Sequence, residues 1–175
     1  NAVVLIATGV NADGRREVLG MRVATSETGP AWNQFFADLV ARGLAGVRLV
    51  TSDAHRGLVE AIAANLPGTS WQRCRTHYAA NLMAVTPKAL WPAVKAMLHS
   101  VYDQPDAKAV HAQFDRLLDY VEDKLPDVFA HLDAARADIL AFTAFPEGLW
   151  AQIWSNNPNE RLNREIRRRT WGSSP

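Results

Sequence analysis

A carboxylate followed by a run of arginines is the most informative chemical feature of the 175-residue sequence. The segment of residues 155–170 reads SNNPNERLNREIRRRT, so Glu160 precedes five arginines within residues 161–169. Asn157 is typical of a helix cap and Pro158 of a first helical position, which puts Glu160 in the first turn of a helix. A carboxylate beside so much positive charge suits a metal site that handles nucleic-acid phosphates. An Asn-x-x-Glu capping box explains the same residues without any chemistry.

Helical spacing places several polar side chains on the face of Glu160. Asn163, Arg164 and Arg167 follow it at three, four and seven positions, and such residues share a helix face. Arg164, Arg167 and Arg168 are expected to contact DNA phosphates. For Arg168, which lies on a neighbouring face, stabilisation of the fold is the alternative.

A second carboxylate follows a short apolar run. Residues 47–58 read VRLVTSDAHRGL, which predicts a buried strand that ends at Asp53 and a helix after His55. Ligands collect beyond the carboxyl ends of strands in open α/β sheets, so Asp53 is a candidate site residue. An ordinary helix cap is the alternative for Asp53.

Residues 73–77, RCRTH, contain the only cysteine of the chain. A structural zinc site needs four ligands, and the sequence has no second pair to join Cys74 and His77. Cys74 is therefore expected to be a small buried residue and His77 a polar contact. Arg73 and Arg75 alternate on a strand expected over residues 70–75, so they should point to one face, where they contact phosphate or water.

Four motifs together carry a family resemblance. They are ADGRREVLG at residues 12–20, SDAHRGL at 52–58, CRTH at 74–77 and ERLNREIRRRT at 160–170. In this order the sequence resembles the bacterial Mutator-type insertion-sequence transposases, from about residue 2 to residue 171.

The resemblance implies a ribonuclease H-like fold with an Asp-Asp-Glu triad, in which Asp53 is the second acid and Glu160 the third. It implies metal-dependent cleavage and strand transfer of insertion-sequence DNA, with Mg²⁺ or Mn²⁺ as cofactor and two ions in the complete enzyme. It also places His55, Cys74, His77 and Asn163 in the active-site neighbourhood. The expected partners are DNA and, for the full-length protein, further copies of itself.

The sequence departs from the family pattern in its acids. The family's first aspartate lies on a strand upstream of the 12–20 motif, and this chain begins after that strand. We therefore expect a catalytic-domain fragment that is inactive by itself. The alternative is a non-catalytic DNA-binding or assembly remnant of a transposase. Asn156 and Asn159 stand where a hydroxyl residue and an aliphatic residue are expected.

Charge is distributed unevenly, although the net charge is only +1. Residues 61–102 contain no acid, whereas residues 103–138 carry nine acids against four bases. This distribution predicts a basic working surface and a separate acidic face. A single cysteine excludes an internal disulfide, and no apolar run is long enough to cross a membrane, so we expect a cytoplasmic, nucleoid-associated protein.

The pattern along the chain predicts an α/β protein with a ribonuclease H-like mixed sheet flanked by helices and an all-helical insertion. Strands are expected over residues 2–10 and 17–25, a helix from residue 29, and then the strands before Asp53 and over residues 70–75. Apolar stripes predict three helices between residues 86 and 144. The expected divisions are a core at 1–85, a helical insertion at 86–145 and a catalytic helix at 146–175. Trp150 and Trp154 are expected to pack in the core, with base stacking as the alternative.

Overall fold

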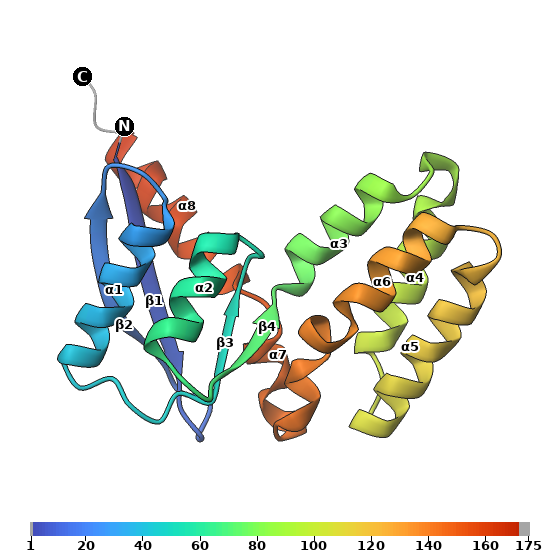
Figure 1. Cartoon of the computed structure of the whole chain (residues 1–175), viewed down its shortest axis with the longest axis horizontal. Helices are drawn as coiled ribbons and strands as arrows, with labels where there is room; N and C mark the ends of the chain where they lie inside the picture. The colour runs from blue at the N-terminus through green and yellow to red at the C-terminus, as the bar shows by residue number, and fades with distance from the viewer. Residues whose placement is uncertain (1, 172–175) are drawn as a thin grey trace. The chain divides into compact units, whose positions relative to one another are not determined.

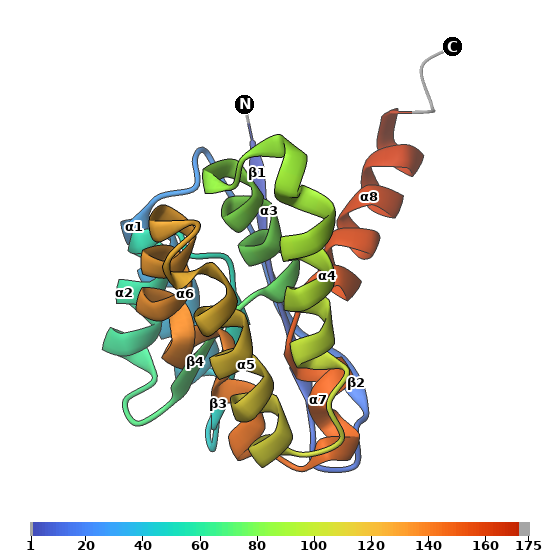
Figure 2. The same cartoon turned by 90° about the vertical axis from the view of Figure 1, so that its right-hand side faces the viewer.

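The computed structural model describes residues 2–171, apart from the side chains of residues 163, 166, 167 and 169–171. The chain divides into two compact units (Figures 1 and 2). Unit 1 contains residues 1–70 and 155–175, and unit 2 contains residues 71–154. The described strands form two two-stranded sheets, β1–β2 and β3–β4, and the boundary between the units falls within β4 (Ser70–Arg73).

Unit 1 begins with an antiparallel hairpin of β1 (Val3–Val10) and β2 (Arg16–Ala24). The turn forms because the side-chain oxygen of Asn11 accepts hydrogen bonds from the backbone of Asp13 (3.1 Å) and Arg15 (2.9 Å). Gly14 has a φ of 75°, a left-handed conformation that glycine adopts without steric cost. The hairpin predicted from the Asn-Ala-Asp-Gly turn is therefore present.

Two helices and a short strand complete the first part of unit 1. They are α1 (Gly29–Ala41), β3 (Leu49–Ser52) and α2 (Arg56–Asn65). Thr28 caps α1 through its side chain, and Pro30 occupies the first turn, as expected for a helix start. Figure 1 shows α1 and α2 side by side, and their backbones approach closely at Gly29 and Gly57. A Cβ at Gly57 would lie 2.7 Å from the Gly29 Cα, so this position has no room for a side chain, whereas a Cβ at Gly29 would make a tight contact of 3.3 Å with the Gly57 Cα.

The last helix, α8 (Asn157–Trp171), returns to unit 1 after the whole of unit 2. The hydroxyl of Thr8 in β1 donates a hydrogen bond of 2.8 Å to the amide oxygen of Asn159. This contact joins residues 151 positions apart and holds the first turn of α8 against the hairpin. Asn159, where the family resemblance predicts an aliphatic residue, thus makes a tertiary contact in this chain.

Unit 2 is helical after β4. It contains α3 (Arg75–Val85), α4 (Trp91–Tyr102), α5 (Ala107–Glu122), α6 (Pro126–Ile139), α7 (Trp150–Ile153) and the 3₁₀ turns Lys88–Leu90, Ala141–Ala144 and Glu147–Leu149. In both views α3 to α6 pack side by side (Figures 1 and 2). The carboxylate of Asp106 caps α5 by accepting the Ala109 N–H at 2.8 Å, and Pro126 opens α6. The three helices predicted between residues 86 and 144 are α4, α5 and α6.

The core of unit 2 is built on apolar stripes of these helices. Phe114 and Leu117 of α5, Leu132 of α6 and Phe142 are fully buried. Trp150 is 6% exposed, and its indole N–H donates to the Phe145 carbonyl at 2.8 Å. The expectation that Trp150 packs in the core is confirmed.

One buried polar residue ties β4 to the end of α6. Gln72 is 0% exposed, and its side-chain nitrogen donates to the backbone oxygens of Arg73 (2.8 Å) and Ile139 (3.0 Å). Its side-chain oxygen accepts from the Phe142 N–H at 2.8 Å. Because buried polar groups are costly without partners, this network fixes where the chain turns after α6.

Three sequence predictions need correction. The strand expected over residues 70–75 ends at Arg73, Cys74 occupies the cap position and Arg75 is the first residue of α3, so the two arginines do not alternate on one strand face. The start of α8 lies at Asn157, which is therefore not the cap, because the Asn156 carbonyl already accepts the N–H groups of Asn159 (2.9 Å) and Glu160 (3.2 Å). The four described strands lie in two sheets rather than in one mixed sheet.

The α/β class is confirmed by these elements. Within residues 2–171, no helix combines the length and the apolar character that crossing a membrane requires.

Candidate functional site

Asp53 directly follows β3 and is exposed. Its Oδ1 accepts the N–H of Ala54 at 2.7 Å, and the Ser52 hydroxyl donates to the Asp53 backbone oxygen at 2.8 Å. These two contacts fix the direction of the chain as it leaves the strand. The carboxylate therefore sits at the solvent-facing end of β3, as predicted from the apolar run.

His55 is the cap residue of α2. Its Nδ1 accepts the N–H of Leu58 at 3.3 Å, so the ring proton in this geometry is on Nε2. The imidazole thus takes the place of the oxygen that caps most helices. This contact accounts for His55 structurally, and its place in an active-site neighbourhood stays a prediction.

Glu160 lies in the first turn of α8 and is half-buried, with a buried Oε1. The neighbouring contact between Asn159 and Thr8 holds this turn against β1. A carboxylate at a helix N-terminus is favoured by the helix dipole. Glu160 is therefore half-buried on a helix turn that is anchored to β1, in contrast to an acid on an exposed helix face.

Asp53 and Glu160 belong to the same compact unit, although 160 − 53 = 107 positions separate them in sequence. One closes a strand and the other opens a helix. Among the described residues, no group of three or more His, Cys, Asp and Glu side chains is arranged to hold a metal ion. Mg²⁺ commonly binds only one or two carboxylates and keeps several of its water ligands, so two carboxylates suffice for a Mg²⁺ site.

The arginines of α8 have different surroundings. Arg161 and Arg164 are exposed. Arg168 is also exposed and forms a two-pronged pair with Glu165, with N···O distances of 2.7 and 3.1 Å. The side chains of Asn163 and Arg167, which the sequence predicts on the face of Glu160, lie outside the described residues. Arg161 and Arg164 are thus the described arginines of α8 best exposed to a phosphate.

Cys74 and His77 lie in unit 2, at the start of α3. Cys74 is 0% exposed and occupies the cap position, which confirms the prediction of a small buried residue. His77 is half-buried, with a buried Nδ1, one turn into the helix. Since Asp53 and Glu160 belong to unit 1, the two pairs are positioned by different units.

Arg73 ends β4 and is half-buried. Its guanidinium lies 5.0 Å from the centre of the Tyr78 ring. The Tyr78 hydroxyl in turn lies 3.2 Å from both the backbone oxygen and Nδ1 of His131. Burial, and then the positive charge of Arg73, lower the pKa of His131. Burial raises the pKa of Asp138, against the opposing effect of Arg73.

Arg75 is held by aromatic rings. Its guanidinium carbon lies 4.0 Å from the centre of the Trp154 ring and 5.3 Å from that of Tyr102. The backbone N–H of Arg75 donates to the Trp154 carbonyl at 3.0 Å. Burial lowers the pKa of Arg75. The cation is therefore preorganised before any ligand arrives.

Sequence reasoning missed this aromatic setting and the residues of α4 that lie near it. Lys95 and His99 are exposed on α4 and four positions apart, a spacing that places both on one face. Tyr102 follows His99 by three positions and is 5% exposed. The i, i+4, i+7 spacing of these three polar residues was the available signal.

Comparison with known proteins identifies the family. The model of the family described as Transposase, Mutator family, matches residues 1–173. The chain is 69% identical over 166 residues to the transposase for insertion sequence element IS1081 of Mycobacterium tuberculosis (strain ATCC 25618 / H37Rv), across 95% of this chain and 40% of that protein. It is 36% identical to the transposase for insertion sequence element ISRM5 of Rhizobium meliloti (strain 1021), across 96% of this chain and 42% of that protein.

A third relative is the transposase for insertion sequence element IS256 in transposon Tn4001 of Staphylococcus aureus, which is 35% identical across 94% of this chain and 42% of its own length. The chain thus spans about two fifths of the length of these relatives. The family match extends over both units and includes all four motifs described above. The chain belongs to the Mutator family of transposases.

Proposed function

We propose that this chain provides part of a transposase catalytic centre that cleaves insertion-sequence DNA and transfers its strands with the help of divalent metal ions. Asp53 acts as the second acid and Glu160 as the third acid of an Asp-Asp-Glu triad. The observation that carries the proposal is that one compact unit holds both acids, one at the end of β3 and one in the first turn of α8.

The order of elements supports a ribonuclease H-like core as the scaffold. A hairpin, a helix, a strand, a second helix and a further strand follow one another before the helical unit, and α8 then returns to unit 1. This order matches the one implied by the family resemblance.

The two carboxylates suit Mg²⁺ or Mn²⁺, since both ions prefer oxygen ligands and keep several waters. When bound, a pair of such ions stabilises both the attacking and the leaving oxygen of phosphoryl transfer. For the 175-residue chain by itself, we propose weak binding of one ion. Asp53 offers an exposed carboxylate and Glu160 a fixed one, so a shared ion would draw on both.

The α8 arginines, together with Arg73 and Arg75, are proposed to hold DNA phosphates. Arg164 supports this best among the described residues because it is exposed and four positions from Glu160. The second candidate function is DNA binding or assembly without catalysis. The same exposed arginines favour it, because phosphate binding does not require a metal.

Titration with Mn²⁺, followed by the loss of the free-ion electron paramagnetic resonance signal, tests the metal site. Asp53→Asn and Glu160→Gln should each weaken binding about tenfold or more, which corresponds to about 1.4 kcal/mol. The double variant should lose little beyond either single variant, since both side chains hold one ion.

Asp13→Asn and Glu17→Gln are matched controls, because both acids are exposed in the hairpin of the same unit. They should bind Mn²⁺ as the parent chain does. Unchanged binding in Asp53→Asn and Glu160→Gln would refute the metal site. If DNA binding were then intact, the non-catalytic function would be favoured.

A further inference from the structure

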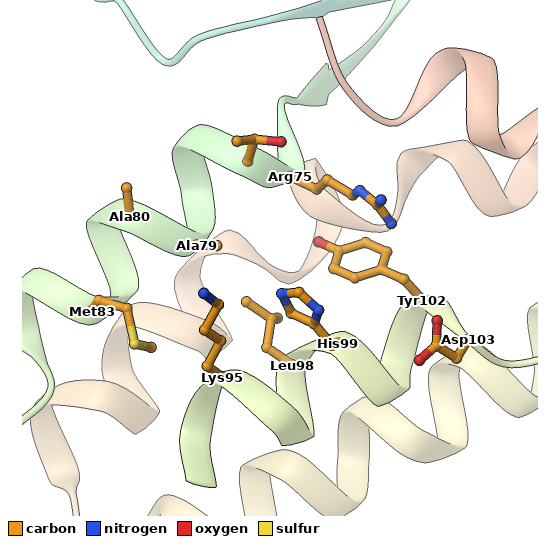
Figure 3. Close-up of a pocket in the computed structure, with 10 residues that line it drawn as sticks. Arg75, Ala79, Ala80, Met83, Lys95, Leu98, His99, Tyr102 and Asp103 are labelled. Atoms are coloured by element: carbon orange, nitrogen blue, oxygen red, sulfur yellow. The ribbon is translucent and has the colours of Figure 1, made fainter. Parts of the chain in front are cut away.

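A groove lies between α3 and α4 within unit 2. It has a volume of about 420 Å³, and its lining includes Arg75 and Met83 from α3 and Lys95, His99 and Tyr102 from α4. Figure 3 shows these side chains reaching toward each other from the two helices. We call this the α3–α4 groove.

The charged side chains that line the groove are mainly basic. Arg75 and Lys95 supply two positive charges and His99 an imidazole, against the single carboxylate of Asp103 at the end of α4. Within the described part of the chain, no ion pair joins Arg75 or Lys95 to a carboxylate. The surroundings add no acid from residues 61–102. The groove therefore favours an anion.

The start of α3 reinforces this preference. Arg75 and Thr76 are its first two residues. The positive end of the 11-residue helix thus opens on the groove, where the dipole favours negative charge. Stacking on Trp154 keeps the Arg75 guanidinium at this end.

A buried hydroxyl gives an independent indication of a ligand. Tyr102 is 5% exposed, and its hydroxyl has no hydrogen-bond partner among the described residues. Figure 3 shows this hydroxyl turned toward α3 across the groove. Buried polar groups without a partner are rare in folded proteins and call for an explanation. A ligand oxygen between the two helices would accept this hydrogen bond after a small opening of the groove.

The rest of the lining is apolar. Met83 and Leu98 are buried side chains that form part of its floor. Volumes of about 300–1,000 Å³ are usual for small-ligand sites, so the groove accommodates a single nucleotide rather than a long segment. An anion-binding end beside an apolar floor matches a phosphate joined to a sugar and base.

We propose that the α3–α4 groove binds one nucleotide unit of a DNA strand, with its phosphate at Arg75 and Lys95 and its sugar and base against Met83 and Leu98. The choice of DNA as the source of the phosphate rests on the proposed function. The groove belongs to unit 2 and the candidate acids belong to unit 1, and the phosphate contacts of the groove need no metal ion.

Binding of the 175-residue chain to a fluorescently labelled single-stranded oligonucleotide, measured by anisotropy at several salt concentrations, tests the proposal. Lys95→Ala should weaken binding about fivefold to tenfold and flatten the log–log salt slope by about 0.7, the value for one phosphate of a single strand. Lys88→Ala removes the same charge from an exposed position outside the groove and should change neither quantity.

Tyr102→Phe separates a binding role from a structural one. Loss of an unpartnered buried hydroxyl should leave the melting temperature unchanged or raise it, whereas loss of a ligand contact should weaken oligonucleotide binding about threefold. A variant with parental affinity would show that the hydroxyl does not meet the ligand. If Lys95→Ala also had the same oligonucleotide affinity and salt slope as Lys88→Ala, the proposal would be overturned.

Competition distinguishes the two sources of a phosphate. A deoxynucleoside monophosphate and inorganic phosphate should displace the oligonucleotide only at concentrations far above its own dissociation constant, since a strand makes further contacts. Displacement by the monophosphate at equal concentration, lost in Lys95→Ala, would identify a free-nucleotide site and overturn the DNA assignment. Failure of Mn²⁺ binding with an intact Lys95 effect would refute the metal site alone.

Discussion

Gln72→Leu should cost the protein about 3 kcal/mol of stability. Gln72 is 0% exposed and makes three hydrogen bonds of 2.8, 3.0 and 2.8 Å with backbone groups of Arg73, Ile139 and Phe142. Leucine has a similar volume, so packing changes little. A net contribution of about 1 kcal/mol per hydrogen bond gives the sum of about 3 kcal/mol, and each backbone group left without a partner increases it.

Urea unfolding followed by tryptophan fluorescence measures this loss. With a slope of about 2 kcal/mol per M, the midpoint should fall by about 1.5 M while the slope stays constant. A loss of this size corresponds to a melting temperature about 6–12 °C lower for a chain of this length.

Gln113→Leu is the matched control. Gln113 also uses its whole amide, as a donor to the Ser100 hydroxyl at 2.8 Å and as an acceptor from Arg116 at 2.7 Å, but its partners are side chains at a partly exposed site. Water can replace the lost hydrogen bonds to these partners, so Gln113→Leu should lower the stability by less than about 1 kcal/mol. Equal losses in Gln72→Leu and Gln113→Leu would refute the reasoning that burial sets the cost.

Three further predictions concern backbone packing, pH and DNA. Gly57→Ala should destabilise the protein by about 1–3 kcal/mol in urea unfolding, because the new Cβ would lie 2.7 Å from backbone of α1, whereas Gly148→Ala, which meets open space, should be neutral. Burial, and then the nearby Arg73, lower the pKa of His131 below its ordinary value of 6.5. The folded state therefore favours the neutral ring, and the stabilisation is complete above this pH and is lost as the pH falls below it. The melting temperature should be lower at pH about 5.5 than at pH about 7.5, and His131→Gln should reduce this difference. An equal difference in both proteins would show that His131 does not cause the pH dependence. Arg164→Ala should flatten the log–log salt slope of duplex DNA binding by about 0.9. Arg56 is an exposed arginine of the same unit, and Arg56→Ala should leave the slope unchanged. Equal slopes in the two variants would show that Arg164 does not contact a phosphate.

The helices with strong periodicity could be predicted from the sequence. Val94, Leu98 and Val101 recur on one face of α4, and all three are buried, so the apolar stripe was sufficient. The hairpin was equally local, since the Asn11 side chain, the left-handed Gly14 and backbone hydrogen bonds among residues 11–15 form its turn. In both places the interactions that form the element lie within a few residues of each other.

The start of α3 could not be predicted in the same way. Arg75 begins this helix with its N–H bonded to the carbonyl of Trp154, a residue 154 − 75 = 79 positions later in the chain. Local spacing favoured a continued strand because Arg73 and Arg75 alternate. The contact that ends β4 and opens α3 is therefore tertiary, and no window of sequence contains both partners.

The candidate acids were predictable in their local setting. Asp53 follows its strand and Glu160 lies in the first turn of its helix, because both positions depend on short-range signals. The contact that anchors α8 was not predictable, since Asn159 meets Thr8 across 151 positions. The family resemblance predicted an aliphatic residue at this position, whereas the structure gives Asn159 a hydrogen-bond partner.

Arginine density predicts nucleic-acid binding, but the surroundings of each arginine decide whether it can take part. Arg168 is engaged by Glu165 in two contacts, so it must give up an existing ion pair to meet a phosphate, and the Arg73 guanidinium packs over Tyr78 with its Nε buried. Arg164 is exposed and can meet a phosphate without first breaking an ion pair, and Arg75 is fixed in place by Trp154 before binding. Exchange of one partner for another contributes little net free energy, whereas an exposed or preorganised cation contributes its full phosphate contact. Among these four arginines, Arg164 in unit 1 and Arg75 in unit 2 should therefore dominate the salt dependence of DNA binding.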